Sequence, residues 1–399
     1  MPVPQYAPTP RELDDVELVV SGALPGPLNA PGSALSLVLP SAVEASATEA
    51  GTVEIVDPEG LPIARVTWPA GEVTGLSSPA YGPFRRLYLT PSRTRETYAG
   101  RTVVPVTDAL TTAEIAEVAA IGPVLLLALV GHGTPSLSPV GLLRASLLAA
   151  EDLPDAAVVA VPLASHDDPE ADHALGVAVV EAYAGGDPIH ALASGTSSEA
   201  ADYTEAIAAV IASDQPAPED QGLVIFFTGL SGSGKSTLAR ALMDRILEQG
   251  ARTVTSLDGD VVRRNLSAGL TFSKEDRETN IRRIGWVAAE ISRHGGLAVC
   301  SPIAPFDSTR QDVRRYVEDA GGAFFLVHVA TPLEECERRD RKGLYAKARA
   351  GEIPEFTGIS SPYEEPADAD VRVDTTGRSI EDALNDVIEA LREAGYLSL

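Results

Sequence analysis

The 399-residue sequence has few cysteines, few lysines and no long apolar run. Cys300 and Cys336 are the only cysteines, which excludes a disulfide framework and is typical of reduced, buried thiols. The longest apolar stretch, residues 118–131, is shorter than the ~20 residues that a membrane helix needs. The first residues lack the basic and apolar regions of a secretory signal. We therefore expect a cytoplasmic protein with no membrane partner.

Basic residues are scarce in the N-terminal half. Residues 1–220 contain 8 arginines and no lysine against 29 acidic residues, a net charge of −21, whereas residues 221–399 carry −5. An acidic surface repels phosphate backbones and keeps a protein in solution. We therefore expect no nucleic-acid partner.

The length predicts two or three domains, and the character of the sequence changes along the chain. Residues 1–105 are rich in proline, glycine and short alternating runs, which predicts a β-rich domain. Residues 106–212 alternate between apolar strands and helical segments, which predicts an α/β domain with parallel strands. Residues 213–221 are polar and proline-rich, as in an exposed linker. Residues 222–399 alternate more strongly and predict a doubly wound parallel sheet of about five strands.

Residues 229–236 read G-L-S-G-S-G-K-S and match the pattern of a phosphate-binding loop between a predicted strand and a predicted helix. The glycines let backbone N–H groups surround a phosphate, and the helix N-terminus adds its positive dipole. Lys235 would bridge the β- and γ-phosphates and act in catalysis, and Ser236 would hold Mg²⁺. The expected ATP-binding residues are Gly229, Leu230, Ser231, Gly232, Ser233, Gly234, Lys235, Ser236 and Thr237.

Two carboxylates and a guanidinium follow the next predicted strand: Asp258, Asp260 and Arg263. Doubly wound folds keep their sites at this end of the strands. A carboxylate there can position Mg²⁺ or accept a proton from a hydroxyl group, and Arg263 can bind an anion in two-pronged geometry. We predict Asp260 as a catalytic residue and Asp258 as a metal ligand; the alternative is a turn with solvated charges.

Residues 222–399 resemble the adenylylsulfate (APS) kinases. These enzymes transfer the γ-phosphoryl group of ATP to the 3′-hydroxyl of adenosine 5′-phosphosulfate, which gives PAPS and ADP. The segment 342–359 is the most specific part, because other small-molecule kinases with this loop do not share it. The matching segments are 229–236, 257–263, 272–273, 276–284, 336–340, 342–353, 356–359 and 362–364.

The resemblance implies a role for each matching residue, Mg²⁺ bound with ATP, and a homodimer. Asp260 would face the 3′-hydroxyl and the metal, and Arg339 would lie beside the adenine of ATP. Phe272 and Phe356 would stack on the acceptor adenine, while the arginines would complement its phosphate and sulfate. The acceptor-binding residues would be Asp260, Arg263, Phe272, Arg277, Asn280, Ile303, Lys342, Lys347 and Phe356.

One departure from the family lies at residues 301–306, which read S-P-I-A-P-F. Many relatives have a second serine in this run that has been assigned as a phospho-acceptor. Ala304 has no hydroxyl group, so a phosphoserine intermediate at this position is excluded. Direct transfer between two bound nucleotides needs only positioning and charge stabilisation and is unaffected.

The N-terminal half resembles ATP sulfurylase, which makes APS from ATP and sulfate, through residues 11–22 and 56–64. Its second part would be a shortened nucleotidyltransferase-like domain. The sulfurylase signature Q-x-R-N-P-x-H-x-x-H is reduced to residues 131–140, where His132 is misplaced, so we expect no activity there. His132, His166, His173 and His190 show no metal-ligand spacing.

Three hypotheses follow for the whole chain. The first is an APS kinase whose N-terminal half serves dimerisation, regulation or docking of a separate ATP sulfurylase. The second is a bifunctional PAPS synthase, and the third is a nucleotide-binding regulatory protein that has lost catalysis. The intact phosphate-binding loop and Asp260 favour the first over the third.

Overall fold

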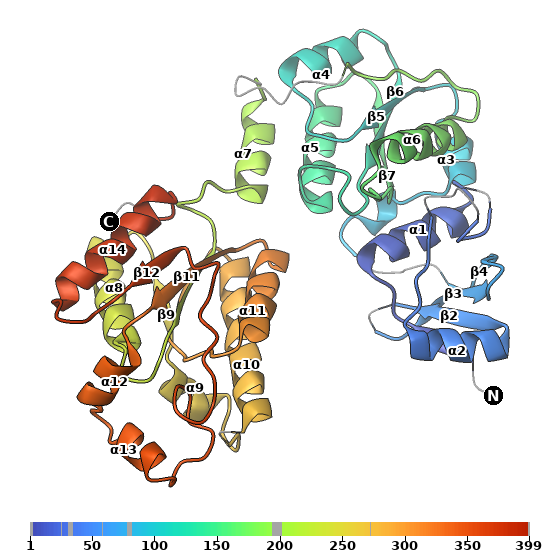
Figure 1. The fold of residues 1–399 in the computed structure, drawn as a ribbon. Coiled ribbons are helices and arrows are strands. Elements are labelled where there is room, and N and C mark those ends of the chain that lie inside the picture. The colour runs from blue at the N-terminus through green and yellow to red at the C-terminus, as the bar shows by residue number, and fades with distance from the viewer. Residues whose placement is uncertain are drawn as a thin grey trace. The chain divides into compact units, whose positions relative to one another are not determined.

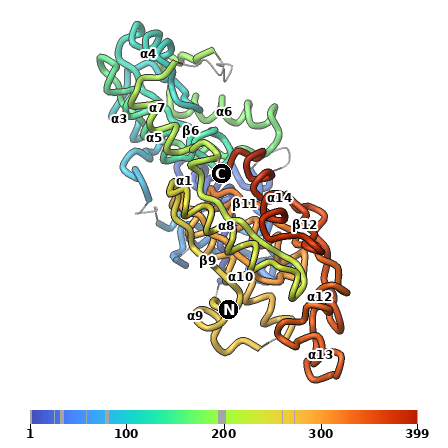
Figure 2. Tube along the Cα trace, turned by 90° about the vertical axis from the view of Figure 1, so that its left-hand side faces the viewer, coloured from blue at the N-terminus to red at the C-terminus, as the bar shows by residue number. Residues whose placement is uncertain are grey.

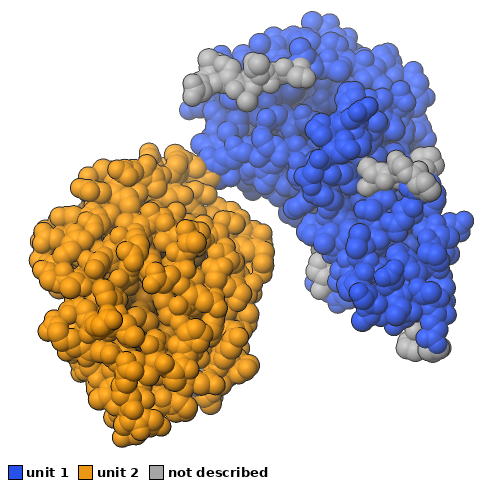
Figure 3. All heavy atoms as spheres, viewed as in Figure 1, with its two compact units in different colours: residues 1–215 blue, residues 216–399 orange. Residues whose placement is uncertain are grey.

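The chain forms two compact units, Met1–Gln215 and Pro216–Leu399 (Figure 3). The computed structural model describes residues 3–24, 26–30, 35–57, 59–77, 82–193, 202–271 and 273–397, except for the side chain of Asp260. The division between the units lies inside the predicted linker, although helix α7 (Glu205–Asp214) includes its first two residues. Within the described residues, no helix is long and apolar enough to span a membrane.

The first part of the N-terminal unit contains a four-stranded sheet of order β1-β2-β3-β4. Strand β1 pairs parallel with β2, and the other pairs are antiparallel. This part also has more helix than its turn-rich sequence predicted, because Thr9 and Glu12 form a capping box that starts α1. Its elements are β1 (Gln5–Tyr6), α1 (Pro10–Ser21), α2 (Ser41–Ala50), β2 (Thr52–Val56), β3 (Pro62–Thr67), β4 (Val73–Gly75), the 3₁₀ helix η1 (Arg85–Leu87) and α3 (Pro91–Tyr98).

The second part of this unit is a three-stranded parallel sheet of order β5-β6-β7, as the alternation of strand and helix predicted. Every residue of β6 is buried, because helices cover both faces of the sheet (Figure 1). Helices α4, α5 and α7 pack on one face, and α6 packs on the other. The elements are β5 (Thr102–Val106), α4 (Thr112–Ala119), β6 (Val124–Leu129), α5 (Pro139–Glu151), β7 (Ala156–Val161) and α6 (Pro169–Ala184).

The C-terminal unit is built on the predicted five-stranded parallel sheet, whose order is β12-β11-β8-β10-β9. Helices α8 and α14 cover one face, and α10 and α11 cover the other (Figure 1). The strands are β8 (Leu223–Thr228), β9 (Val254–Leu257), β10 (Leu297–Cys300), β11 (Ala323–Val329) and β12 (Val371–Val373). The helices are α8 (Lys235–Gln249), α9 (Gly259–Asn265), α10 (Lys274–Arg293), α11 (Asp307–Asp319), α12 (Leu333–Arg339), α13 (Leu344–Arg349) and α14 (Ile380–Glu393).

The order of the strands brings the functional segments together. Strand β8 lies between β10 and β11, and all five strands run in the same direction. The loops that follow the strands therefore meet at one edge of the sheet, beside the point where the strand order reverses. Figures 1 and 2 show α9, α12 and α13 at this end of the unit.

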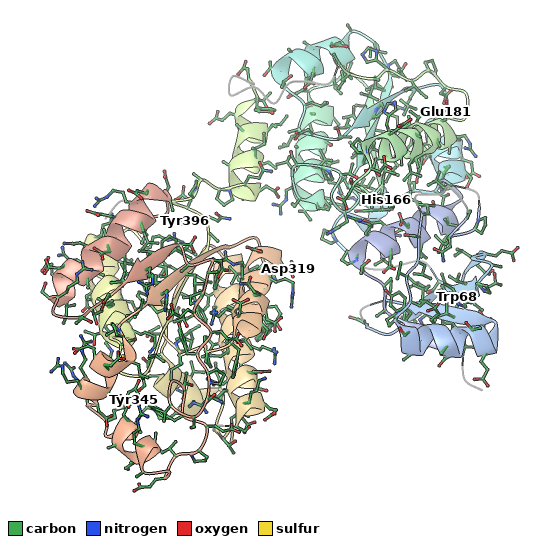
Figure 4. All side chains as sticks on the ribbon, in the orientation of Figure 1. Trp68, His166, Glu181, Asp319, Tyr345 and Tyr396 are labelled. Atoms are coloured by element: carbon green, nitrogen blue, oxygen red, sulfur yellow. The ribbon has the colours of Figure 1, made fainter. Side chains whose placement is uncertain are left out.

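Within the N-terminal unit, α1 packs its acidic residues against the loops that follow β6 and β7. The backbone N–H of His132 donates to Asp14 at 2.7 Å. The imidazole of His166, which Figure 4 labels, lies 3.1 Å from the carboxylate of Asp15 and 3.1 Å from that of Asp172. Burial, together with the neighbouring carboxylates, raises the pKa of Asp14 to about 7.

The raised pKa of Asp14 predicts that the stability of the N-terminal unit depends on pH. Folded Asp14 keeps its proton up to about pH 7, whereas the unfolded side chain loses it near pH 4, so stability should fall as pH rises through this window. Replacing Asp14→Asn should remove this loss and raise the free energy of unfolding at pH 8 by roughly 2–4 kcal/mol.

The measurement is denaturant unfolding followed by Trp68 fluorescence, in a background where Trp286, the other tryptophan, is replaced by phenylalanine. The advantage of Asp14→Asn should shrink steadily toward pH 4. An equal difference at pH 4 and pH 8 would show that Asp14 is not the titrating group.

Candidate active site

The phosphate-binding loop lies between β8 and α8, as predicted. Its backbone needs glycine at three positions, because Gly229, Gly232 and Gly234 have φ values of 147°, 77° and 107°. A side chain at Gly229 would also collide with the sheet, since its Cβ atom would lie 2.4 Å from the carbonyl oxygen of Val329. The three glycines therefore fix the path of the loop.

The carbonyl groups of this loop accept hydrogen bonds from side chains. The hydroxyl groups of Thr331 and Thr375 both donate to the carbonyl oxygen of Ser233 at 2.9 Å. Both threonines are buried and lie just after β11 and β12. They anchor the loop to two neighbouring strands, a role that the motif alone did not reveal.

Lys235 is buried at the start of α8. Its ammonium group donates to the carbonyl oxygen of Leu230 at 2.7 Å. Burial lowers the pKa of Lys235 to about 8, because the charged form loses its hydration. Below about pH 8 the side chain is thus held at the loop in its charged form, which a phosphate group would stabilise.

The loop borders a cavity of about 930 Å³ that unites most of the predicted site residues. This volume is in the range of small-molecule sites. The predicted residues that line it are Ser231, Gly232, Gly234, Lys235, Ser236, Thr237, Asp258, Arg263, Arg277, Asn280, Ile303, Arg339, Lys342 and Phe356.

Some predicted residues do not line this cavity. Gly229, Leu230 and Ser233 belong to the loop but are not among the lining residues. Lys347 is exposed on α13 and does not line the cavity either. Phe272 and the side chain of Asp260 lie outside the described part of the structure, so their predicted roles remain predictions.

The wall formed by α10 carries polar groups that are poorly hydrated. Arg277 donates to the hydroxyl groups of Thr357 at 3.0 Å and Ser361 at 3.1 Å, which ties α10 to the loop after α13. Asn280 is 4% exposed, and its Oδ1 atom has no hydrogen-bond partner among the described residues. Asn280 lines the cavity, and a buried amide oxygen without a partner is suited to a polar ligand.

The loop after β10 is held in an unusual conformation. Ala304 is buried with a φ of 45°, a region that residues other than glycine seldom adopt. Buried Arg310 donates to the carbonyl oxygen of Ala304 at 2.8 Å, and Thr228 donates to that of Ile303 at 2.6 Å. These bonds hold the backbone of Ile303 at the cavity, where a contact with the acceptor was predicted.

The opposite end of the cavity is formed by α12 and the segment after β12. Arg339 donates to the hydroxyl and the carbonyl oxygen of Thr375, at 2.8 and 2.9 Å. The guanidinium groups of Arg338 and Arg339 lower the pKa of Glu335 to about 2. Arg341 and Arg378 also line this end and were not predicted. Neither arginine belongs to a motif that would have identified it from the sequence.

Two oxygen ligands are available for Mg²⁺ beside Lys235. The side chains of Ser236 and Asp258 line the cavity, and Asp258 accepts a hydrogen bond from Ser301 at 3.1 Å. Mg²⁺ keeps several waters and is usually bound through one or two protein oxygens together with substrate phosphates. The predicted pair fits this mode. Among the described residues, no group of three His, Cys, Asp or Glu side chains could hold a metal ion.

Comparison with known proteins agrees with this geometry. The family model for adenylylsulphate kinase matches residues 221–374. The C-terminal unit belongs to the adenylylsulphate kinase family. The structure of a hexameric APS kinase from Thiobacillus denitrificans matches 100% of this chain and 95% of that chain, with 26% identity and a TM-score of 0.71. The APS kinase of Mycobacterium tuberculosis, solved with AMPPNP and APS, is 46% identical over 43% of this chain and 98% of that chain, with a TM-score of 0.41.

Curated relatives carry a different name. A sulfate adenylyltransferase of Aspergillus terreus is 46% identical over 194 residues, 49% of this chain and 34% of the relative. One from Emericella nidulans is 49% identical over 176 residues, 44% of this chain and 31% of the relative. The chain thus spans about a third of the length of these relatives.

The low pKa of Lys235 predicts proton uptake when a nucleotide binds to the APS kinase domain. Near pH 8 about half of the Lys235 side chains should lack the proton, and phosphate binding favours the charged form. We expect uptake of about half a proton per nucleotide at pH 8 and almost none at pH 6.5.

Calorimetry of ADP binding in buffers with different ionisation enthalpies measures this uptake. Lys235→Met should abolish it and should weaken binding. Equal proton uptake by the wild type and Lys235→Met would contradict the assignment.

Proposed function

We propose that this protein transfers the γ-phosphoryl group of ATP to the 3′-hydroxyl of APS and forms PAPS and ADP. The observation that supports this most strongly is a single cavity with the phosphate-binding loop on one wall and Arg277, Asn280 and Phe356 on another. This arrangement allows a donor phosphate and an acceptor nucleotide to meet. Positioning of this kind, together with charge stabilisation, accounts for most of the catalysis in phosphoryl transfer.

The residues of the chain divide the work between donor and acceptor. Lys235 and the loop would bind the β- and γ-phosphates of ATP, and Arg339 would lie beside its adenine. Ser236 and Asp258 would hold Mg²⁺, which neutralises phosphate charge when it is bound. Asp260 would accept the proton of the 3′-hydroxyl as it attacks the γ-phosphorus.

The acceptor would lie along α10 and the segment after α13. Arg263 and Arg277 supply positive charge for its phosphate and sulfate groups, and Asn280 supplies an oxygen acceptor. Phe356, together with Phe272, would stack on the adenine ring. Because Ala304 has no hydroxyl group, transfer proceeds directly from ATP to APS, without a phosphoserine at this position.

We propose that the N-terminal unit makes no APS. Carboxylates of the chain occupy N–H groups at the end of its parallel sheet, where a ligand would bind. Asp14 accepts from His132, and Asp214 accepts from the backbone N–H of Ser138 at 2.7 Å, at the start of α5. The unit would instead serve homodimerisation, regulation or docking of a separate ATP sulfurylase in a cytoplasmic pathway of sulfate activation.

An assay of the full-length protein with Mg-ATP tests the proposal. With APS, ADP and PAPS should form in equal amounts. Asp260→Asn should lower kcat by about 100-fold or more, because general-base catalysis is lost, while nucleotide affinity stays within threefold. The matched control is Asp319→Asn, an exposed carboxylate at the end of α11, which should keep the wild-type rate (Figure 4). An unchanged rate in Asp260→Asn would refute its role.

The same assay with sulfate in place of APS separates the two enzyme hypotheses. The bifunctional alternative is suggested by the names of the curated relatives, and it requires sulfate-dependent release of pyrophosphate. We expect no pyrophosphate, because residues 131–140 lack the arginine and the histidine pair of the sulfurylase signature. Release of pyrophosphate would establish a PAPS synthase, and silence with both substrates would favour a regulatory protein.

A further inference from the structure

One side chain in the C-terminal unit contacts both the phosphate-binding loop and the acceptor side of the cavity. Tyr345 lies on α13 and is 3% exposed. Its hydroxyl group donates to the carbonyl oxygen of Ser231 at 2.8 Å. Its ring and that of Phe356 form a T-shaped pair, with 5.0 Å between ring centroids and 78° between ring planes. Figure 4 shows Tyr345 at the end of the unit where α12 and α13 lie.

The position of Tyr345 is fixed by the start of its own helix. The carboxylate of Asp340 accepts the backbone N–H of Tyr345 at 3.1 Å and that of Ala346 at 3.0 Å. Gly343 allows the turn between them, with a φ of 66°. These bonds fix the backbone of Tyr345, and the burial of the ring leaves it little room to adopt another rotamer.

We infer that Tyr345 is a positioning residue that couples the binding of ATP to the binding of the acceptor. The inference rests on the proposed function. Tyr345 lines the cavity, and the role inferred for it depends on its contacts with Ser231 and Phe356, not on a contact with a substrate. Phosphates bound to the loop restrict the peptide of Ser231, whose carbonyl oxygen accepts the hydroxyl of Tyr345. The ring of Tyr345 in turn restricts the ring of Phe356. A nucleotide stacked on Phe356 acts on the same chain in reverse, because coupling between two sites is reciprocal.

The size of the coupling follows from the contact that carries it. A single hydrogen bond with a neutral donor is worth enough to change an affinity by about 3- to 10-fold. A purely structural role would also explain the contact, because a buried tyrosine hydroxyl usually finds a hydrogen-bond acceptor. Such a role would affect stability, or both affinities equally, but not the ratio of affinities with and without the second ligand.

The experiment measures binding of a non-hydrolysable ATP analogue to the full-length protein by calorimetry, with and without saturating APS. In the wild type, APS should tighten analogue binding by about 3- to 10-fold. Tyr345→Phe keeps the ring and removes the hydroxyl group, so the two affinities should then differ by less than about 1.5-fold. The matched control Tyr396→Phe also removes a hydroxyl group and keeps the ring, which packs on Phe325 at the far end of the unit in Figure 4. This variant should retain wild-type coupling.

A second variant addresses the other end of the chain of contacts. Phe356→Leu removes the ring that Tyr345 touches, so coupling should fall here too, beside a loss of APS affinity. The inference is overturned if Tyr345→Phe keeps the wild-type coupling, or if the wild type shows none although it binds both ligands. If the wild type binds no APS, the proposed function itself fails.

Discussion

The functional site depends on the hydrogen bonds that hold the backbone of the phosphate-binding loop. Its backbone carbonyl groups accept hydrogen bonds from Lys235, Tyr345, Thr331 and Thr375, which come from α8, α13 and the ends of β11 and β12. A loop whose carbonyl groups are satisfied in this way keeps its shape before a ligand arrives. The first N–H groups of an α-helix lack the acceptors that later turns provide, so the start of α8 is suited to bind phosphate. Because each anchor comes from a different element, the fold of the whole unit determines the geometry of the loop.

The C-terminal unit could be predicted closely from the sequence because its signals are local. The buried runs at residues 223–228 and 323–329 are almost entirely apolar, as strands covered on both faces require, and both form strands. Gly250 ends α8 in the left-handed conformation, and Ser379 caps α14. The motif at residues 229–236 contains both the glycines that form the turn and the lysine and serine that are expected to bind phosphate and metal.

The parts that were missed depend on contacts between distant residues. The hydrogen bonds from Thr331 and Thr375 to Ser233 span 98 and 142 residues, and neither threonine belongs to a motif. In the N-terminal unit, His166 bonds to Asp15 across 151 residues. A search for spacing cannot find such pairs, because the topology brings them together. The helices of the first 100 residues were missed for a different reason: frequent prolines concealed the capping box of Thr9 and Glu12.

We propose that the cavity brings the γ-phosphate of ATP and the 3′-hydroxyl of APS together in one chain. Phosphorus NMR of a reaction with the purified full-length protein, Mg-ATP and APS tests this claim most directly, since it identifies the group that receives the phosphate. We expect that signals of ADP and of a 3′-phosphomonoester grow together while the phosphosulfate signal persists. Growth of inorganic phosphate instead, or loss of the phosphosulfate signal without a 3′-phosphomonoester, would contradict it.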